Sequence, residues 1–213
     1  QEIFPRIRLR GVDRSLFVSL YHVRGLSKKD LFRTPWLFIG VGNVGKAVLR
    51  RARQFGMRLL GNDIVEIEPD FLLEFGVEMT DLATLMEKSD FISVNCTLNP
   101  SSHHLINADS LSLCKPDAII INTARGPIVE EQALIHSLSI GQIGGAALDV
   151  FEVEPLPLDS PLMKMDNVML APHNSNSSPY FWERVHWNTI FNLLKAFQID
   201  IQDIDSLRKM EIA

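Results

Sequence analysis

An arginine, two acidic residues and a histidine in the second half of the chain could together support chemistry on a small carboxylic acid. Arg125 directly follows a strongly apolar run, where its guanidinium can offer a two-pronged hydrogen bond to a carboxylate. Glu152 and Glu154 lie in one short segment, and His173 follows further along the chain. An imidazolium can give a proton to a carbonyl oxygen, and a neighbouring carboxylate stabilises that imidazolium. With a hydride donor, one arginine, one glutamate and one histidine suffice to interconvert a 2-oxo acid and a 2-hydroxy acid.

A glycine-rich loop earlier in the chain could bind the pyrophosphate of a dinucleotide. Residues 40–45 have the sequence Gly-Val-Gly-Asn-Val-Gly, between an apolar run and a helical pattern. In such a loop Gly40 permits the tight turn, Gly42 lets the backbone approach the pyrophosphate, and Gly45 lets the helix pack closely on the strand. The N-terminus of the following helix offers unpaired N–H groups and the positive end of its dipole to an anion.

An acidic residue stands where a dinucleotide fold needs one. Asp63 lies 18 residues after Gly45, just past the second predicted strand, where a carboxylate accepts hydrogen bonds from the adenosine ribose hydroxyls. Its charge would repel a 2′-phosphate, so NAD is favoured over NADP. Residues 40–47 are also close to a Walker A loop, but Ala47 lacks the hydroxyl that holds magnesium there. A methyltransferase that binds S-adenosylmethionine could use a similar loop and acid, but the later motifs argue against it.

Short apolar runs alternate with helical patterns along most of the chain. An alternation of this kind predicts an α/β fold with a doubly wound parallel sheet. In such a sheet the ligand lies at the carboxyl ends of the strands, so the glycine loop, Arg125 and His173 are expected at that edge. Strands are predicted at 36–39, 57–61, 91–94, 118–122, 145–150 and 168–171, and helices at 43–55, 81–88, 130–138 and 181–197.

Three motifs, in this order, resemble those of the D-isomer-specific 2-hydroxyacid dehydrogenase family, which includes phosphoglycerate dehydrogenase. They are Asn-Thr-Ala-Arg-Gly at 122–126, Ala-Leu-Asp-Val-Phe-Glu-Val-Glu-Pro at 147–155 and Ala-Pro-His at 171–173. The resemblance runs from about Thr34 to about Phe197. It implies a Rossmann NAD-binding domain and an oxidoreductase that transfers a hydride between NAD and a small D-2-hydroxy acid or 2-oxo acid.

The resemblance also assigns roles to individual residues. It implies that Arg125 binds the substrate carboxylate and carbonyl, that Glu154 rather than Glu152 pairs with the catalytic histidine, and that His173 is the acid/base. Thr97 stands where the family often has proline, beside the cofactor. The residues expected to contact the cofactor are Gly40, Gly42, Asn43, Val44, Gly45, Asp63, Cys96, Thr97, Thr123, Ala124 and Asp149.

The resemblance covers only part of the family's usual length. Residues 1–34 are expected to be a poorly assigned remnant of a substrate domain or a linker, 35–178 the NAD-binding domain, and 179–213 a C-terminal helix and tail. Most of the family's substrate domain is therefore expected to be missing, and the start at Gln1 suggests an incomplete or processed chain. A non-catalytic NAD-binding module, or a truncated fragment of such a dehydrogenase, stays open as an alternative.

Composition narrows the other partners. The 213 residues carry a net charge of −5, which argues against a nucleic-acid partner. No apolar run approaches the length of a membrane span and no signal peptide is recognisable, so a cytoplasmic protein is expected. The spacing of Cys96, His103 and His104 matches no standard metal site, and their loop, residues 99–107, is instead expected to face the cofactor. A homodimer is an expectation of the family.

Overall fold

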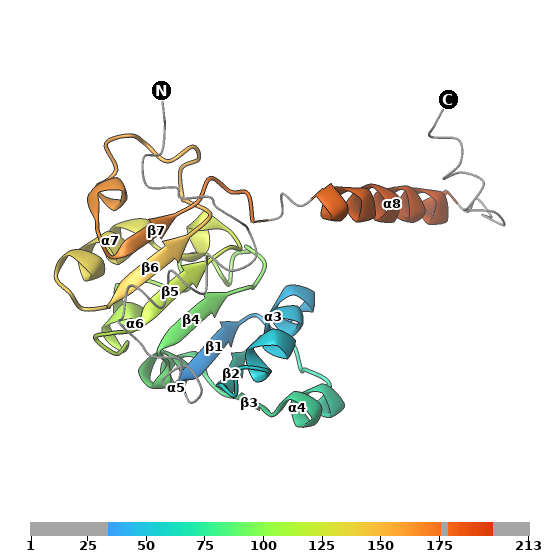
Figure 1. Cartoon of the computed structure of the whole chain (residues 1–213), viewed down its shortest axis with the longest axis horizontal. Coiled ribbons are helices and arrows are strands. Elements are labelled where there is room, and N and C mark those ends of the chain that lie inside the picture. The colour runs from blue at the N-terminus through green and yellow to red at the C-terminus, as the bar shows by residue number, and fades with distance from the viewer. Residues whose placement is uncertain (1–33, 176–178, 198–213) are drawn as a thin grey trace. The chain divides into compact units, whose positions relative to one another are not determined.

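The computed structural model describes residues 34–175 and 179–197 (Figure 1). They fall into two compact units that separate after His173. The predicted N-terminal remnant, apart from Thr34, lies outside the described residues. The domain boundaries after residues 34 and 178 therefore stay predictions.

The larger unit is built on a seven-stranded sheet in which every pair of neighbouring strands is parallel. The strand order is β3-β2-β1-β4-β5-β6-β7, so the chain starts in the middle, runs outward to β3 and returns to β4 beside β1. A crevice opens at the carboxyl ends of the strands where the order reverses, and ligands bind there in folds of this kind. The strands are β1 (Pro35–Ile39), β2 (Arg58–Asn62), β3 (Val77–Met79), β4 (Phe91–Val94), β5 (Ile119–Asn122), β6 (Gly145–Leu148) and β7 (Val168–Leu170).

Helices cover both faces of the sheet, and β1 divides its side chains between two cores. Leu37 and Ile39 belong to the core under α5 (Leu82–Lys88), α6 (Ala108–Ser112) and α7 (Glu131–Ser139). Trp36 and Phe38 belong to the core on the other face, with α3 (Asn43–Arg53) and α4 (Pro69–Phe75). Because β1 is buried on both faces, its sequence is a continuous apolar run instead of an alternating one.

The predicted doubly wound parallel sheet is confirmed, and all six predicted strands and four predicted helices are present with ends shifted by a few residues. The predictions missed α4, β3 and α6. Strand β3 has only three residues and owes its place to pairing with β2, where Val77 lies opposite Leu59. Helix α6 has five residues and is held by a capping box between Asn107 and Ser110.

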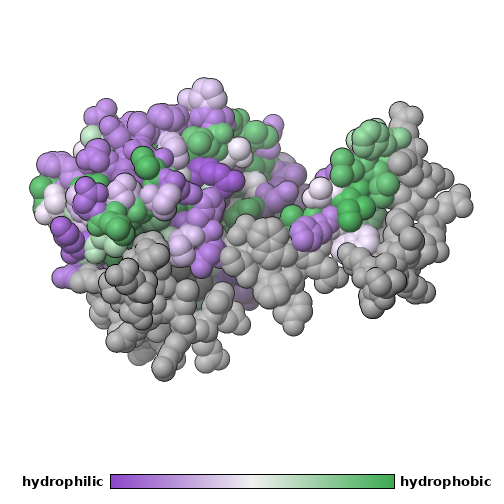
Figure 2. Space-filling view, turned by 90° about the horizontal axis from the view of Figure 1, so that it is seen from above, coloured by the Kyte–Doolittle hydropathy of each residue, from purple (hydrophilic) through white to green (hydrophobic). Residues whose placement is uncertain are grey.

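The smaller unit contains one described helix, α8 (Pro179–Ala196), which begins two residues before the predicted start. Taken by itself, it carries apolar surface, visible as green atoms at the right of Figure 2. The large apolar residues Ile190, Leu193 and Phe197 are all exposed. No helix in the described part of the chain is long and apolar enough to cross a membrane.

Candidate active site

Two glycines of the loop between β1 and α3 are required by close backbone contacts. Gly40 has a φ of +91°, and a Cβ on it would lie 2.5 Å from the backbone nitrogen of Cys96. A Cβ on Gly45 would lie 2.1 Å from the carbonyl oxygen of Gly40, so only glycine lets α3 start this close to the strand. Gly42 differs, because a Cβ there would meet nothing within 4 Å. The loop is thus open at Gly42, the position where a pyrophosphate is expected.

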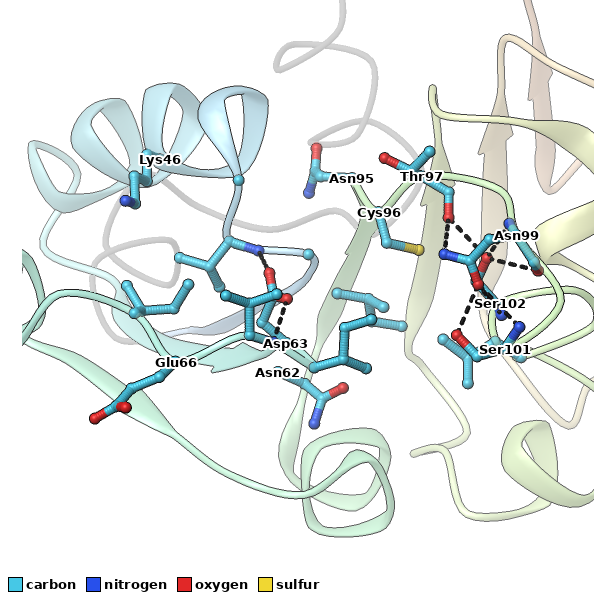
Figure 3. A pocket seen from close by; sticks show the side chains of 18 of the residues that line it. Lys46, Asn62, Asp63, Glu66, Asn95, Cys96, Thr97, Asn99, Ser101 and Ser102 are labelled. Carbon is cyan, nitrogen blue, oxygen red and sulfur yellow. Dashed lines mark hydrogen bonds between the residues drawn. The ribbon is translucent and has the colours of Figure 1, made fainter.

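Asp63 follows β2 and holds the glycine loop in place. Its Oδ2 accepts a hydrogen bond from the Val41 N–H at 2.6 Å, and its Oδ1 accepts one from the Val65 N–H at 3.0 Å. Figure 3 shows this carboxylate turned toward the loop, on the opposite side of Cys96 from Asn99. Each carboxylate oxygen can accept a further hydrogen bond. The carboxylate can therefore fix the loop and still accept a ribose hydroxyl, whereas the sequence suggested only the second role.

Two adjoining pockets lie along the carboxyl edge of the sheet, each of about 430 Å³. This volume is within the range of roughly 300–1,000 Å³ that is usual for ligand pockets. The first, called here the Asp63 pocket, is lined by Gly40, Gly42, Lys46, Asp63, Asn99, Ser101 and Ser102, among others. The second, called the Arg125 pocket, is lined by Val44, Val94, Leu98, Thr123, Ala124 and Arg125. Asn95, Cys96 and Thr97 line both, so the two pockets form one elongated cleft that fits a dinucleotide.

Cys96 stands at the junction of the two pockets. Burial raises the pKa of its thiol, and the nearby negative charge of Asp63 raises it further against the effect of a backbone hydrogen bond. A thiol in this environment stays protonated at neutral pH and is a poor nucleophile. Cys96 therefore offers the cleft an apolar wall and no covalent chemistry.

Glu154 and His173 meet on the loops that follow β6 and β7. The Nδ1 atom of His173 lies 2.8 Å from Oε2 of Glu154, and the other carboxylate oxygen of Glu154 accepts the Phe151 N–H at 3.0 Å. His173 has a φ of +52°, a backbone conformation that is costly for a residue other than glycine. Glu152, two residues before Glu154, points to a different histidine, His104. The structure thus places Glu154, and not Glu152, against His173.

The charges around Glu154 include Arg125. Desolvation raises the pKa of Glu154, but the hydrogen bonds from His173 and Phe151 and the charges of His173 and Arg125 lower it more. The net result is a pKa below the usual value, so Glu154 is a carboxylate at neutral pH. Arg125 donates one N–H to the carbonyl oxygen of Ala124 at 2.6 Å, and a guanidinium has four further donors for a ligand.

Asn122, at the end of β5, shapes the turn that carries Arg125, and the sequence analysis did not single it out. Its Nδ2 donates to the Arg125 carbonyl oxygen at 2.9 Å, and its Oδ1 accepts the Ala124 N–H at 3.0 Å. Only 1% of Asn122 is exposed. A buried amide at the end of an apolar strand was the available signal, because a buried polar group needs such partners.

Several predicted cofactor residues do not line either pocket. Asn43 opens α3, and Gly45 packs against Gly40 instead of facing the cleft. Asp149 is buried and donates its backbone N–H to the Asn122 carbonyl oxygen at 3.0 Å. A contact between Asp149 and the nicotinamide stays a prediction.

The prediction that the loop of residues 99–107 faces the cofactor holds for one half of it. Asn99, Ser101 and Ser102 line the Asp63 pocket, and hydrogen bonds to Asn99 tighten this turn. The prediction is wrong for the imidazoles of His103 and His104, which line a separate hollow beside α5 and α6. The reason is the backbone at His104, where a φ of +51° reverses the chain and directs the ring toward Glu152.

The parallel sheet of this topology, the glycine loop and the acidic residue after β2 define a dinucleotide-binding domain. The family model for the NAD-binding domain of D-isomer specific 2-hydroxyacid dehydrogenases matches residues 18–175. The chain belongs to this family and carries its NAD-binding domain. The match begins before Thr34, so the similarity reaches further toward the N-terminus than the motifs alone indicated.

Individual relatives agree with this assignment. A glyoxylate reductase of Korarchaeum cryptofilum is 47% identical over 149 residues, which are 70% of this chain and 45% of the relative. A hydroxypyruvate reductase of Thermotoga maritima is 37% identical over 188 residues, or 87% of this chain and 60% of the relative. The chain thus spans about half the length of these curated relatives.

A solved structure shows the same fold. The D-lactate dehydrogenase of Aquifex aeolicus, in complex with NAD and lactic acid, has a TM-score of 0.69 and 30% identity. The similarity covers 81% of this chain and 56% of that enzyme.

Proposed function

We propose that the protein to which this chain belongs is an NAD-dependent oxidoreductase that interconverts a small D-2-hydroxy acid and the corresponding 2-oxo acid. The observation that carries the proposal is the contact between Glu154 and His173, with Arg125 close enough for its charge to act on Glu154. All three follow neighbouring strands at the edge that holds the dinucleotide cleft. The relatives named glyoxylate reductase and hydroxypyruvate reductase support small 2-oxo acids as the substrate class.

Each of the three residues has a defined task in this proposal. Arg125 binds the substrate carboxylate and so orients the carbonyl carbon. His173 gives a proton to the carbonyl oxygen during reduction and takes it back during oxidation. Glu154 accepts the hydrogen bond from Nδ1 of His173, which leaves Nε2 for the substrate and stabilises the charged imidazolium. When bound, the nicotinamide supplies or accepts the hydride.

The cleft residues hold the cofactor in the same proposal. Gly42 and the N-terminus of α3 bind the pyrophosphate, Asp63 binds the adenosine ribose, and the wall from Thr97 to Ala124 faces the nicotinamide. The negative charge of Asp63 favours NAD over NADP. We extend the proposal to a cytoplasmic protein that forms a homodimer, as we expect of the family.

A panel of 2-oxo acids tests this proposal. The chain is incubated with NADH and glyoxylate, hydroxypyruvate, 3-phosphohydroxypyruvate or pyruvate, and NADH absorbance is followed. Consumption of NADH with at least one acid is expected. NADH binding without consumption for every acid would contradict activity in this chain and favour the alternative, a non-catalytic NAD-binding module.

A further inference from the structure

We propose that His104 is a positioning residue that, through its hydrogen bond to Glu152, holds the 151–155 loop so that Glu154 meets His173. The inference rests on the proposed function for its catalytic meaning, but the arrangement itself can be tested without turnover. His104 lies outside both pockets of the cleft. It would therefore act through Glu152 and not on substrate or cofactor.

His104 connects the loops that follow three neighbouring strands. It lies after β4, and its backbone N–H donates to the carbonyl oxygen of Pro127 in the 3-10 helix η1 (Gly126–Ile128) after β5. Its Nε2 lies 2.5 Å from Oε1 of Glu152 in the loop after β6. The left-handed backbone of His104 makes both contacts possible at once. A conformation this costly is kept only where surrounding contacts hold it.

The Glu152 contact reaches Glu154 through a short segment of chain. The backbone N–H of Glu152 donates to Oε2 of Glu131 at 3.2 Å, and the N–H of the preceding Phe151 donates to Glu154 itself. The loop is therefore fixed on one side by His104 and Glu131, and on the other by the Glu154 carboxylate. If the side chain of Glu152 were released, the Phe151–Glu154 turn would lose its outer anchor.

The packing beneath this loop makes its position narrow. A Cβ placed on Gly126 would lie 1.8 Å from the Phe151 carbonyl oxygen and 2.5 Å from the backbone nitrogen of Glu152. The loop thus rests directly on the residue that follows Arg125. A shift of the loop would disturb the distance between Glu154 and His173 and also the surroundings of Arg125.

The test measures the His173 imidazole directly. Nδ1 of His173 faces a carboxylate, so the neutral ring carries its proton on Nδ1. Nitrogen-15 NMR of ring-labelled histidine reports the share of this tautomer in the full chain, with His173→Gln identifying the signal. His104→Asn removes the reach to Glu152 while keeping a residue that tolerates the left-handed backbone. We expect the share of the Nδ1–H tautomer to fall in His104→Asn and to be restored, at least in part, by His104→Gln, which keeps a donor.

A neighbouring residue supplies the control. His103 is exposed and stacks on the His104 ring with centroids 4.0 Å apart, and no hydrogen bond of its side chain holds the 151–155 loop. His103→Asn should leave the tautomer of His173 as in the parent. Glu152→Ala removes the same contact from the other side and serves if His104→Asn does not fold. A His173 tautomer that is the same in the parent, in folded His104→Asn and in Glu152→Ala would overturn the proposal, whatever the turnover assay shows.

Discussion

Gly126 lies so close beneath Phe151 that any side chain at position 126 would collide with the backbone of the loop leading to Glu154. A Cβ at this position would come within 1.8 Å of the Phe151 carbonyl oxygen and 1.9 Å of its carbonyl carbon. The glycine after Arg125 is therefore explained by packing between two loops that carry catalytic residues. In the sequence it was only the last letter of a motif.

Gly126→Ala should move these two loops apart. Overpacking of this kind costs about 1–3 kcal/mol of the free energy of unfolding, which urea denaturation would measure. NADH oxidation should fall further than stability does, because Arg125 and Glu154 are displaced together. Gly141→Ala is the control, since a Cβ there meets nothing within 4 Å and only the positive φ of +70° is strained. Equal turnover in Gly126→Ala and Gly141→Ala would show that the loop contact does not position the site.

Asp63 should set the preference between the two nicotinamide cofactors. Asp63→Asn removes the charge that repels a 2′-phosphate and weakens the hydrogen bonds offered to the ribose and the Val41 N–H. Bonds to charged groups contribute about 1.5–3 kcal/mol, so the Kd for NADH should rise by roughly tenfold or more. The Kd for NADPH should change less, and fluorescence titration of both cofactors would measure the ratio. Asp159→Asn, an exposed aspartate outside both pockets, is the control. An unchanged ratio in Asp63→Asn would remove Asp63 from cofactor selection.

Arg125 should affect substrate more than cofactor. Arg125→Lys keeps the charge but loses the planar two-pronged donor, so kcat/KM for the 2-oxo acid should fall by roughly 10- to 100-fold. The Kd for NADH should change little by comparison. Arg58→Lys is a matched control, because Arg58 begins β2 at the opposite edge of the sheet and pairs on the surface with Glu78 at 2.7 Å. If both variants behave alike in steady-state kinetics, Arg125 does not bind the substrate carboxylate.

The lowered pKa of Glu154 predicts a pH dependence of stability. A carboxyl group with a depressed folded-state pKa stabilises the fold above its unfolded value, here near 4.5, and this contribution is lost as pH falls through the lower folded value. The difference in unfolding free energy between the parent and Glu154→Gln should therefore be larger at about pH 6 than at about pH 3. Because 37% of the Glu154 side chain is exposed, solvent screening should keep it within about 1 kcal/mol.

A second background identifies the partner in that pH dependence. In His173→Gln the same Glu154→Gln step should cost less at about pH 6, since the main opposing hydrogen bond is already gone. A cost that is independent of both pH and the residue at 173 would contradict the coupling of the two side chains.

The sequence predicted the fold well because burial on both sheet faces leaves a continuous apolar run. Residues 91–94 were predicted as a strand and are β4 without a change at either end. Strand β3 escaped because three residues with an exposed Glu78 in the middle carry too little pattern, and pairing with β2 supplies the rest. Motif order placed Arg125, Glu154 and His173 on adjacent loops.

Contacts between distant segments were beyond the sequence. The bond between His104 and Glu152 joins residues 48 apart and depends on a positive φ that no residue pattern announced. The bond from Val41 to Asp63 likewise needs the strand register, which brings Ile39 beside Asn62. Both contacts fix backbone and not ligand, so chemical motifs could not indicate them.

The comparison of the parent with His173→Gln tests the central claim most directly. NADH oxidation is measured for both proteins with the best 2-oxo acid, and NADH binding is measured for both by fluorescence. Loss of an acid/base residue should lower kcat by about 10²- to 10⁴-fold, while the Kd for NADH stays within about twofold of the parent. His136→Gln, on the exposed face of α7, should turn over like the parent. Equal turnover by His173→Gln and the parent would contradict the account, because the proton would then come from another group.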